Sequence, residues 1–297
     1  MTTPAATLRS LLARPDRAVL APGCYDALTA SLIERAGFEA AYLSGASIAY
    51  TRLGRPDIGL TTAAEVENVI ANIRDRCPDL PLVVDADTGF GNAMNVQRTV
   101  RTFERAGASA IQLEDQLMPK RCGHLAGKRV VPAADMVGKI KAACDARRDA
   151  STIIIARTDA LGVNGFDDAM ARAAAYVDAG CDLLFVEAPQ DEAQMRTVSA
   201  RFAARVPLLA NMVEGGTTPI RDAASLAAAG FKLVIFPGAA TRVLVFALEK
   251  FFADLKRDGS SAAWRDRMLD LKGLNAVLGT DALLEAGRAY DPEIQDA

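Results

Sequence analysis

The sequence is poor in histidine, has no paired cysteines and carries little net charge, and each of these features excludes a class of site or partner. A single histidine among 297 residues leaves no set of imidazoles to hold a metal. The five cysteines are odd in number, scattered and without a CxxC pair, which excludes a disulfide framework and a zinc site. A net charge of −3 and a pI near 5.4 argue against a nucleic-acid partner, which requires a basic face.

Long apolar runs are also absent. None reaches the length needed to cross a bilayer, and the first residues lack a basic-then-apolar signal pattern. We therefore expect a cytoplasmic protein without a membrane partner. With 51% hydrophobic residues, the chain has enough apolar side chains for a large core, and α/β barrels of this length commonly form one domain.

Short apolar runs alternate with longer alanine-rich amphipathic segments along the chain, which is the pattern of repeated strand–helix units. Eight runs predict strands: Ala18–Ala21, Ala40–Ser44, Leu80–Asp85, Ala108–Glu114, Thr152–Arg157, Asp182–Glu187, Val206–Asn211 and Lys232–Pro237. The segments between them predict helices such as Asn95–Ala106, Ala133–Ala146, Phe166–Ala179, Glu192–Phe202 and Ser225–Ala229.

A weak repeat supports this count, because an Ala-Gly pair precedes four of the predicted strands, at 36–37, 106–107, 179–180 and 229–230. Glycine is the preferred residue just past a helix end. Eight such units without a linker predict an α/β fold, a closed (β/α)8 TIM-type barrel, as a single domain over 1–297. From about residue 241 we expect a helical extension with helices at Thr241–Arg257 and Ala262–Leu271, one of which packs on a neighbouring subunit in a helix-swapped arrangement.

Polar residues stand where six of these strands end. In a barrel the carboxyl ends of the strands share one face, and active sites form there. The strand ends carry Ser44 and Gly45, then Asp85 to Asp87, Glu114 and Asp115, Arg157 to Asp159, Glu187, and Asn211 with Glu214. We therefore expect an active site at this mouth.

Asp85, Asp87 and Glu114 predict a metal site. Three carboxylates in one place repel one another unless a cation neutralises them. Oxygen ligands without imidazoles favour Mg²⁺, with Mn²⁺ as an alternative, over Zn²⁺. The competing interpretation is that the Asp-x-Asp pair only caps the helix that begins near Asn95.

Arg157 ends an apolar strand, and a buried guanidinium needs an anion, which it binds in a two-point geometry. That anion is either a substrate carboxylate or a side chain of the protein, Glu187 or Asp159. Arg157 can bind both a substrate carboxylate and a protein side chain if Glu187 orients its guanidinium toward the substrate.

The segment Lys120-Arg121-Cys122-Gly123-His124 places a thiol between two cations and an imidazole. Such a setting lowers the pKa of a thiol and makes Cys122 a candidate proton donor or nucleophile, although a cysteine is often only a small buried apolar residue. His124, taken alone, is compatible with a structural role or with a place in the site.

Two further loops are notable. Gly89–Asn92 is rich in glycine, but a lone Gly-x-Gly is weak evidence for phosphate binding. Arg52–Asp57 combines charge with glycine, which is typical of a gating loop and equally of an ordinary surface connection.

At these residues the chain resembles the isocitrate lyase/phosphoenolpyruvate mutase superfamily over nearly its whole length. The matching segments are YLSGAS (42–47), VVDADTGFGN (83–92), LEDQLMPKRCGH (113–124), ARTDA (156–160), FVEAP (185–189) and NMVEGGTTP (211–219). The cysteine of the KRCGH segment is similar to that of the lyase branch, because the mutases, phosphonopyruvate hydrolases and oxaloacetate decarboxylases of the superfamily lack it.

The resemblance implies roles for the residues that match. Asp85 is implied to hold Mg²⁺ directly, Asp87 through water, with Glu114 in the same shell and Asp57 reaching it when the gating loop closes. Ser44, Gly45 and Ala46 are implied to bind the carboxylate of a 2-oxoacid. The remaining implied substrate contacts are Arg157, Glu187, Asn211, Cys122, Gly123, His124 and Arg242.

Within the lyase branch the segments 113–124 and 211–219 most resemble 2-alkylmalate (2,3-dimethylmalate) lyases. Methylisocitrate lyases carry a late arginine for a third carboxylate, whereas Leu269–Ala276 here offers only Lys272; Arg52, Arg55 and Arg242 are the residues that would compensate. The resemblance thus implies a Mg²⁺-dependent carbon–carbon lyase acting on a small di- or tricarboxylate, in a homo-oligomer, usually a tetramer.

In the expected reaction, Cys122 donates a proton to the carbanion that bond cleavage leaves, and Arg157 and Lys120 with Arg121 balance its charge. The alternatives are a 2-methylisocitrate lyase giving pyruvate and succinate, an oxaloacetate hydrolase at the same site, and an inactive barrel that serves as a binding protein.

Overall fold

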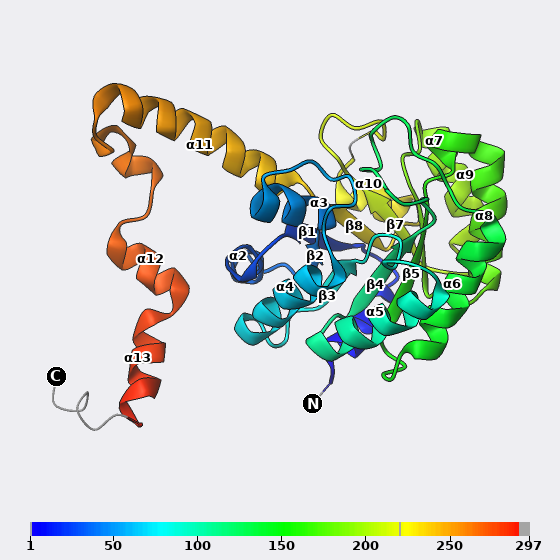
Figure 1. Cartoon of the computed structure of the whole chain (residues 1–297), viewed down its shortest axis with the longest axis horizontal. Coiled ribbons are helices and arrows are strands. Elements are labelled where there is room, and N and C mark those ends of the chain that lie inside the picture. Colours follow the sequence, from blue (N-terminus) through cyan, green and yellow to red (C-terminus); the bar gives the residue numbers. More distant parts are fainter. Residues whose placement is uncertain (1, 220, 291–297) are drawn as a thin grey trace. The chain divides into compact units, whose positions relative to one another are not determined.

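The computed structural model describes residues 2–219 and 221–290, and in it eight parallel strands pair in chain order to form a closed barrel (Figure 1). The strands are β1 (Val19–Cys24), β2 (Ala41–Leu43), β3 (Leu82–Asp85), β4 (Ala110–Glu114), β5 (Ile153–Thr158), β6 (Leu183–Val186), β7 (Leu208–Asn211) and β8 (Leu233–Phe236). Strand β8 pairs with β1, from Val19 opposite Leu233 to Pro22 opposite Phe236, and closes the barrel. The predicted (β/α)8 barrel and its eight strands are confirmed.

Strand residues alternate between two buried layers. Val83, Ile153 and Ile155 belong to the cluster that fills the barrel, whereas Val84 and Ile154 pack in the layer beneath the helices. This alternation follows from the two-residue period of a strand. The same alternation of inward and outward side chains continues to the end of each strand, so it determines which polar side chains there face the barrel axis.

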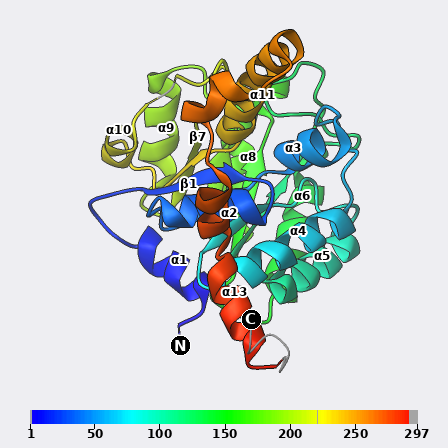
Figure 2. The same ribbon diagram turned by 90° about the vertical axis from the view of Figure 1, so that its left-hand side faces the viewer.

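The helices of the barrel unit are α1 (Pro4–Leu12), α2 (Ala27–Arg35), α3 (Gly45–Ile48), α4 (Ala63–Arg76), α5 (Ala93–Ala106), α6 (Ala133–Ala146), α7 (Leu161–Asn164), α8 (Phe166–Asp178), α9 (Glu192–Phe202) and α10 (Ala223–Ala228), with a π-helix, η1, at Ala49–Leu53. Helices α4, α5 and α6 lie side by side around the barrel (Figure 2). The predicted helix-ending glycines Gly37, Gly107, Gly180 and Gly230 all have a positive φ, as the Ala-Gly repeat implied.

Helix α1 closes the amino-terminal end of the barrel. Leu8, Leu11 and Leu12 are buried in the same cluster as the barrel interior. Arg9 donates to the carboxylate of Asp182 at 2.9 Å and ties the helix to the start of β6. The opposite end of the barrel is therefore the one that carries a site.

The chain divides into two compact units, one ending at Thr241 and the other beginning at Arg242. The later elements are α11 (Ala239–Asp258), a 3₁₀-helix, η2 (Ala262–Arg267), α12 (Leu271–Leu278) and α13 (Thr280–Arg288). The helix predicted near Thr241–Arg257 is confirmed. The predicted single domain with an extension from about residue 241 stays a prediction.

The helix predicted over Ala262–Leu271 is wrong in type and extent. Here η2 ends at Arg267, Met268 is extended, and α12 starts only at Leu271. The carboxylate of Asp270 accepts a hydrogen bond from the backbone N–H of Gly273 at 2.6 Å, so it caps a new helix instead of lying inside one. No helix among the described residues is long and apolar enough to cross a membrane.

Candidate active site

The strand ends surround a cavity of about 50 Å³ at the carboxyl end of the barrel. It is lined by Tyr42, Ser44, Ala46, Asp57, Asp85, Lys120, Cys122, Gly123, His124, Arg157, Glu187, Asn211, Val213, Ile235 and Pro237. Eleven of these fifteen residues belong to the predicted site. Tyr42, Val213, Ile235 and Pro237 were not predicted. Tyr42 lies two residues before Ser44 and Ile235 two residues after Leu233, so the two-residue period of a strand was the available signal that both face inward.

Ser44 and the residues after it form one wall. The Ser44 hydroxyl accepts a hydrogen bond from the backbone N–H of Ser47 at 3.2 Å and caps the short helix α3. A side chain on Gly45 would place its Cβ 3.2 Å from Asp85 Oδ2, so glycine lets this turn approach the carboxylate. The predicted Ser44, Gly45 and Ala46 group thus lies beside Asp85.

Lys120 joins two aspartates. Its Nζ lies 2.6 Å from Asp87 Oδ1 and 2.7 Å from Asp57 Oδ1, and its side chain is only 3% exposed. Burial raises the pKa of Asp87 to about 6, although Lys120 opposes this shift. The competing interpretation, in which Asp-x-Asp caps a helix, is wrong, because the side chain of Asn92 caps α5 by accepting from the N–H groups of Met94 and Asn95.

The three predicted metal ligands are all buried, but they do not converge on one point. Asp87 is paired with Lys120, and Glu114 Oε2 lies 3.4 Å from Arg157 Nε. Among residues 2–219 and 221–290, no three His, Cys, Asp or Glu side chains form a group that could hold a metal ion.

The surroundings nevertheless suit a hard cation. Glu114 Oε1 is buried without a hydrogen-bond partner, and burial raises the pKa of Glu114 well above its usual range. In and around the cavity, the buried carboxylates also outnumber the buried Lys and Arg side chains: they are Asp57, Asp85, Asp87, Glu114, Asp159 and Glu187 against Lys120, Lys128 and Arg157. An all-oxygen set with excess negative charge is what Mg²⁺ or Mn²⁺ binds.

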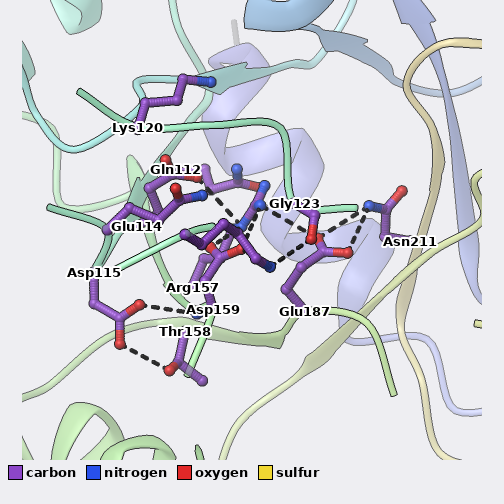
Figure 3. Close-up of polar contacts among 12 residues, drawn as sticks. Gln112, Glu114, Asp115, Lys120, Gly123, Arg157, Thr158, Asp159, Glu187 and Asn211 are labelled. Atoms are coloured by element: carbon purple, nitrogen blue, oxygen red, sulfur yellow. Dashed lines mark hydrogen bonds and ion pairs between the residues drawn. The ribbon is translucent and has the colours of Figure 1, made fainter. Parts of the chain in front are cut away.

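Arg157 lies at the centre of the polar cluster (Figure 3). Its Nε donates to Asp159 Oδ2 at 2.8 Å and its Nη2 to Asp159 Oδ1 at 3.0 Å. Glu187 Oε2 lies 3.6 Å from Nη2, and the guanidinium stacks over the ring of Phe185. The predicted internal ion pair is therefore present, and Arg157 also lines the cavity, so the two interpretations are compatible.

Asp115 supports this cluster from outside the barrel. It accepts hydrogen bonds from the Thr158 hydroxyl at 2.8 Å, the Asp159 N–H at 2.8 Å and the Tyr176 hydroxyl at 2.7 Å. In Figure 3 Asp115 lies on the far side of Arg157 from Asn211, and a dashed line joins its carboxylate to Thr158. No role was predicted for Asp115. Because neighbouring strand residues point to opposite sides, its place directly after Glu114 was the available signal that it faces the helices.

The prediction of a lowered thiol pKa for Cys122 is wrong, because burial raises that pKa. The neighbouring cations do not face the sulfur. Lys120 is engaged by Asp57 and Asp87, and the exposed Arg121 donates through Nη1 to the carbonyl of Ala126 at 2.8 Å. A raised pKa favours the protonated form of the Cys122 thiol, which suits a proton donor better than a nucleophile.

His124 and Asn211 hold Glu187 from two sides. His124 Nε2 lies 3.2 Å from Glu187 Oε1, and Asn211 Nδ2 donates to Glu187 Oε2 at 3.1 Å. Burial alone would raise the pKa of Glu187, but Arg157 and His124 lower it overall. His124 Nδ1 also accepts from the backbone N–H of Thr217 at 3.4 Å, so His124 links the KRCGH segment to the loop after β7.

Asp57, the predicted gating residue, is buried against the KRCGH segment. Besides its ion pair with Lys120, its carbonyl accepts a hydrogen bond from the backbone N–H of Cys122 at 3.1 Å. Arg52 and Arg55 are exposed, and Arg52 donates to Asn68 at 3.2 Å outside the cavity. Neither is placed to compensate for a missing late arginine. Arg242 and Lys272 belong to the second unit, and their roles stay predictions.

The family model described as phosphoenolpyruvate phosphomutase matches residues 8–256. Among curated relatives, the 2,3-dimethylmalate lyase of Eubacterium barkeri is 43% identical over 286 residues, which cover 96% of this chain and 98% of that protein. The 2-methylisocitrate lyase of Aeropyrum pernix is 48% identical over 265 residues, covering 89% and 84% respectively.

Several solved structures have the same fold as this chain and at least 30% sequence identity to it. A crystal structure of 2,3-dimethylmalate lyase, a PEP mutase/isocitrate lyase superfamily member, has a TM-score of 0.92 and 38% identity, covering 98% of this chain and 96% of its own. Oxaloacetate acetylhydrolase with 3,3-difluorooxalacetate has a TM-score of 0.91 and 32% identity, covering 97% of each chain. Phosphonopyruvate hydrolase with oxalate and Mg²⁺ has a TM-score of 0.86 and 30% identity, covering 97% and 99%.

Proposed function

The chain belongs to the PEP mutase/isocitrate lyase superfamily and is a carbon–carbon lyase, and on that premise we propose that it cleaves a 2-alkylmalate such as 2,3-dimethylmalate. The products are a 2-oxoacid and a carboxylic acid. The observation that carries this proposal is that the half-buried thiol of Cys122 lines one small cavity together with Arg157, Lys120 and Asp85.

Cleavage of the substrate proceeds in steps in which the side chains of the cavity have separate roles. A base removes the proton of the substrate's 2-hydroxyl, the C2–C3 bond breaks, and its electron pair passes to C3, beside the second carboxylate. Cys122 then donates its proton to C3, which completes the acid product. Arg157 and Lys120, which line the cavity, would balance this charge, and Ser44, Gly45 and Ala46 would bind the carboxylate on C1.

We propose Mg²⁺ as the cofactor, with Mn²⁺ able to replace it. Asp85 would hold it directly, Asp87 through water, and Glu114 would complete the oxygen set, with Asp57 close to Asp87 through their shared partner Lys120. When bound, the ion stabilises negative charge on the substrate's 2-oxygen. A superfamily structure crystallised with oxalate and Mg²⁺ supports this assignment.

The cavity favours a dicarboxylate over a tricarboxylate. Of the described residues that line it, only Lys120 and Arg157 are Lys or Arg, and each already pairs with carboxylates. A third substrate carboxylate would have no further cation there. The 2-methylisocitrate lyase activity of the Aeropyrum relative remains the second candidate, because that protein is 48% identical to this chain.

Oxaloacetate hydrolysis is a third candidate, supported by the similarity to oxaloacetate acetylhydrolase. It needs a water molecule in the cavity, whereas the lyase reaction consumes none. The two activities therefore differ in products: oxalate and acetate for the hydrolase, a 2-oxoacid and a saturated acid for the lyase.

We also propose a cytoplasmic homotetramer in which the terminal helices are exchanged between subunits. Each unit exposes apolar side chains that water disfavours. In the barrel unit these include Leu28, Leu32 and Phe38, and in the second unit Val243, Phe246, Phe252, Leu271 and Leu283. Light scattering coupled to size-exclusion chromatography tests the assembly, and a monomer at micromolar concentration would reject it.

The function is tested by incubating the purified protein with 2,3-dimethylmalate, 2-methylisocitrate and oxaloacetate, each with Mg²⁺ and with excess chelator. We expect pyruvate and propionate from dimethylmalate at the highest kcat/KM. Faster release of succinate from methylisocitrate would transfer the assignment to the second candidate, and oxalate from oxaloacetate to the third.

A further inference from the structure

Lys128 is a buried lysine for which the proposed reaction has no use. Its side chain is only 5% exposed, yet it does not line the cavity. Its Nζ donates to two acceptors, the backbone carbonyl of Gly123 and Asp159 Oδ1, the latter at 2.9 Å. Burying an ammonium group costs free energy unless the group is paired in this way. A lysine buried at this position therefore indicates a specific role for its two contacts.

The two acceptors belong to different parts of the site. Gly123 lies in the loop between β4 and α6 that also carries Cys122, while Asp159 follows β5. The base of the loop is fixed by the bridge between Gln116 and Val130 and by the hydrogen bond from the N–H of Leu117 to the carbonyl of Arg129. Lys128 thus connects the tip of the loop, beyond this base, to the barrel.

The tip rests directly on the ion pairs of the site. A Cβ on Gly123 would lie 2.5 Å from Arg157 Nη2 and 2.9 Å from Glu187 Cδ, so the backbone there touches both side chains. Because Cys122 precedes Gly123, the position of the sulfur over the cavity depends on where the Gly123 carbonyl is held.

The same bond reaches Arg157 through Asp159. Asp159 Oδ1 accepts from both Lys128 Nζ and Arg157 Nη2, and the Asp159 backbone is held by Asp115. Loop position and guanidinium position are therefore set by one carboxylate. Because Lys128 links Gly123 of the loop to Asp159, which also binds Arg157, closure of the loop and orientation of the Arg157 guanidinium are coupled.

We propose that Lys128 is a positioning residue that latches the 116–130 loop over the cavity, so that substrate enters when the bond from Nζ to Gly123 breaks and Cys122 is aligned when it re-forms. The expected effect of the latch on kcat rests on the proposed function, whereas its expected effect on the accessibility of Cys122 does not. It acts through Gly123 and Asp159 and touches no reacting atom.

The first experiment measures how readily Cys122 reacts with iodoacetamide in the full-length protein without substrate, by mass spectrometry of the peptide that contains it. Lys128→Met keeps most of the length of the side chain and removes its charge and donors. We expect Cys122 to be alkylated at least about tenfold faster, the factor that a charge-assisted hydrogen bond contributes to an equilibrium. Lys128→Arg should restore a rate close to that of the wild type.

Arg129→Met is the matched control, because Arg129 is the adjacent, exposed cation of the same loop. It should leave the alkylation rate unchanged. Far-UV circular dichroism and the labelling rates of Cys24 and Cys181, which are buried elsewhere in the barrel unit, report whether Lys128→Met is folded. If it is not, Lys128→Gln replaces it, since it retains a neutral donor toward Gly123 and should give an intermediate rate.

The second experiment measures kcat and KM for 2,3-dimethylmalate. With the latch lost, kcat should fall by at least about tenfold, because the loop closes over bound substrate less often, and Lys128→Arg should recover most of it. Equal alkylation rates in the wild type and in a folded Lys128→Met would overturn the latch. A wild type inactive on every 2-alkylmalate would instead overturn the proposed function, while the contrast in alkylation would still support the latch.

Discussion

The backbone N–H of Cys122 donates to the carbonyl of Asp57 at 3.1 Å, and this bond joins the loop that carries the thiol to the loop predicted to gate the site. A second contact joins the same two loops. Lys120, in the loop that carries the thiol, forms an ion pair with the carboxylate of Asp57 in the other loop. The two loops therefore cover the cavity together, and substitutions in either should affect the thiol.

Cys122→Ser should reduce kcat by about 10²- to 10⁴-fold, the range for loss of a positioned proton donor. The serine hydroxyl is a far weaker acid than the thiol and fits the same space. Product formation from 2,3-dimethylmalate measures the effect. Mg²⁺ affinity and the melting temperature should match those of the wild type, and near-normal turnover would reject the proton-donor role.

Gly123→Ala should abolish activity while the protein still folds. The added Cβ would stand 2.5 Å from Arg157 Nη2, so the loop tip must lift away from the site. Gly138→Ala is the matched control, because nothing lies within 4 Å of a Cβ at that helical position. Steady-state kinetics compares the two, and equal activity in both variants would show that the tip does not rest on Arg157 in the active enzyme.

Lys120→Met should destabilise the metal-free protein by about 3–5 kcal/mol, the usual cost of removing one partner from a buried ion pair. It leaves the carboxylates of Asp57 and Asp87 without the ammonium that lies between them. Urea unfolding measures the loss. Lys141→Met, on the exposed side of α6, is the control and should be within about 0.5 kcal/mol of the wild type.

Asp159 should make stability depend on pH at the acid end. Burial opposes ionisation of its carboxyl, but Arg157 and Lys128 lower its pKa to about 2 from an ordinary value of 3.8. Because the folded-state value is the lower one, the stabilisation is fully present above pH 4 and is lost as the pH falls toward 2. Its size is about 2 kcal/mol.

Urea unfolding of Asp159→Asn between pH 2.5 and 5 checks this prediction. The difference in unfolding free energy between wild type and variant should shrink as the pH falls. A difference that stays constant over this range would contradict the pairing.

Removal of metal should abolish turnover reversibly. Excess chelator is expected to stop product formation, and added Mg²⁺ or Mn²⁺ to restore it. Calorimetric titration of Mg²⁺ into the substrate-free protein gives an independent readout, and Asp85→Asn should weaken that binding by at least about tenfold. Full activity after exhaustive chelation would rule out the proposed cofactor.

Much of this molecule followed from local rules applied to the sequence. Eight apolar runs and the Ala-Gly pairs before four of them were sufficient for the barrel, because strand and helix periodicity and helix ends depend on near neighbours in the chain. The same rules placed Ser44, Asp85, Glu114, Arg157, Glu187 and Asn211 at one mouth, since the ends of parallel strands converge.

Tertiary structure decided what these side chains pair with. The sequence put two cations next to Cys122, but a loop directs adjacent side chains in different directions: Arg121 turns outward to Ala126, and Lys120 turns inward to Asp57 and Asp87. The partial burial of the Cys122 thiol, and with it the direction of its pKa shift, depends on loops more than sixty residues apart in the sequence. Neither local periodicity nor composition carries that information, because it arises only when the chain has closed on itself.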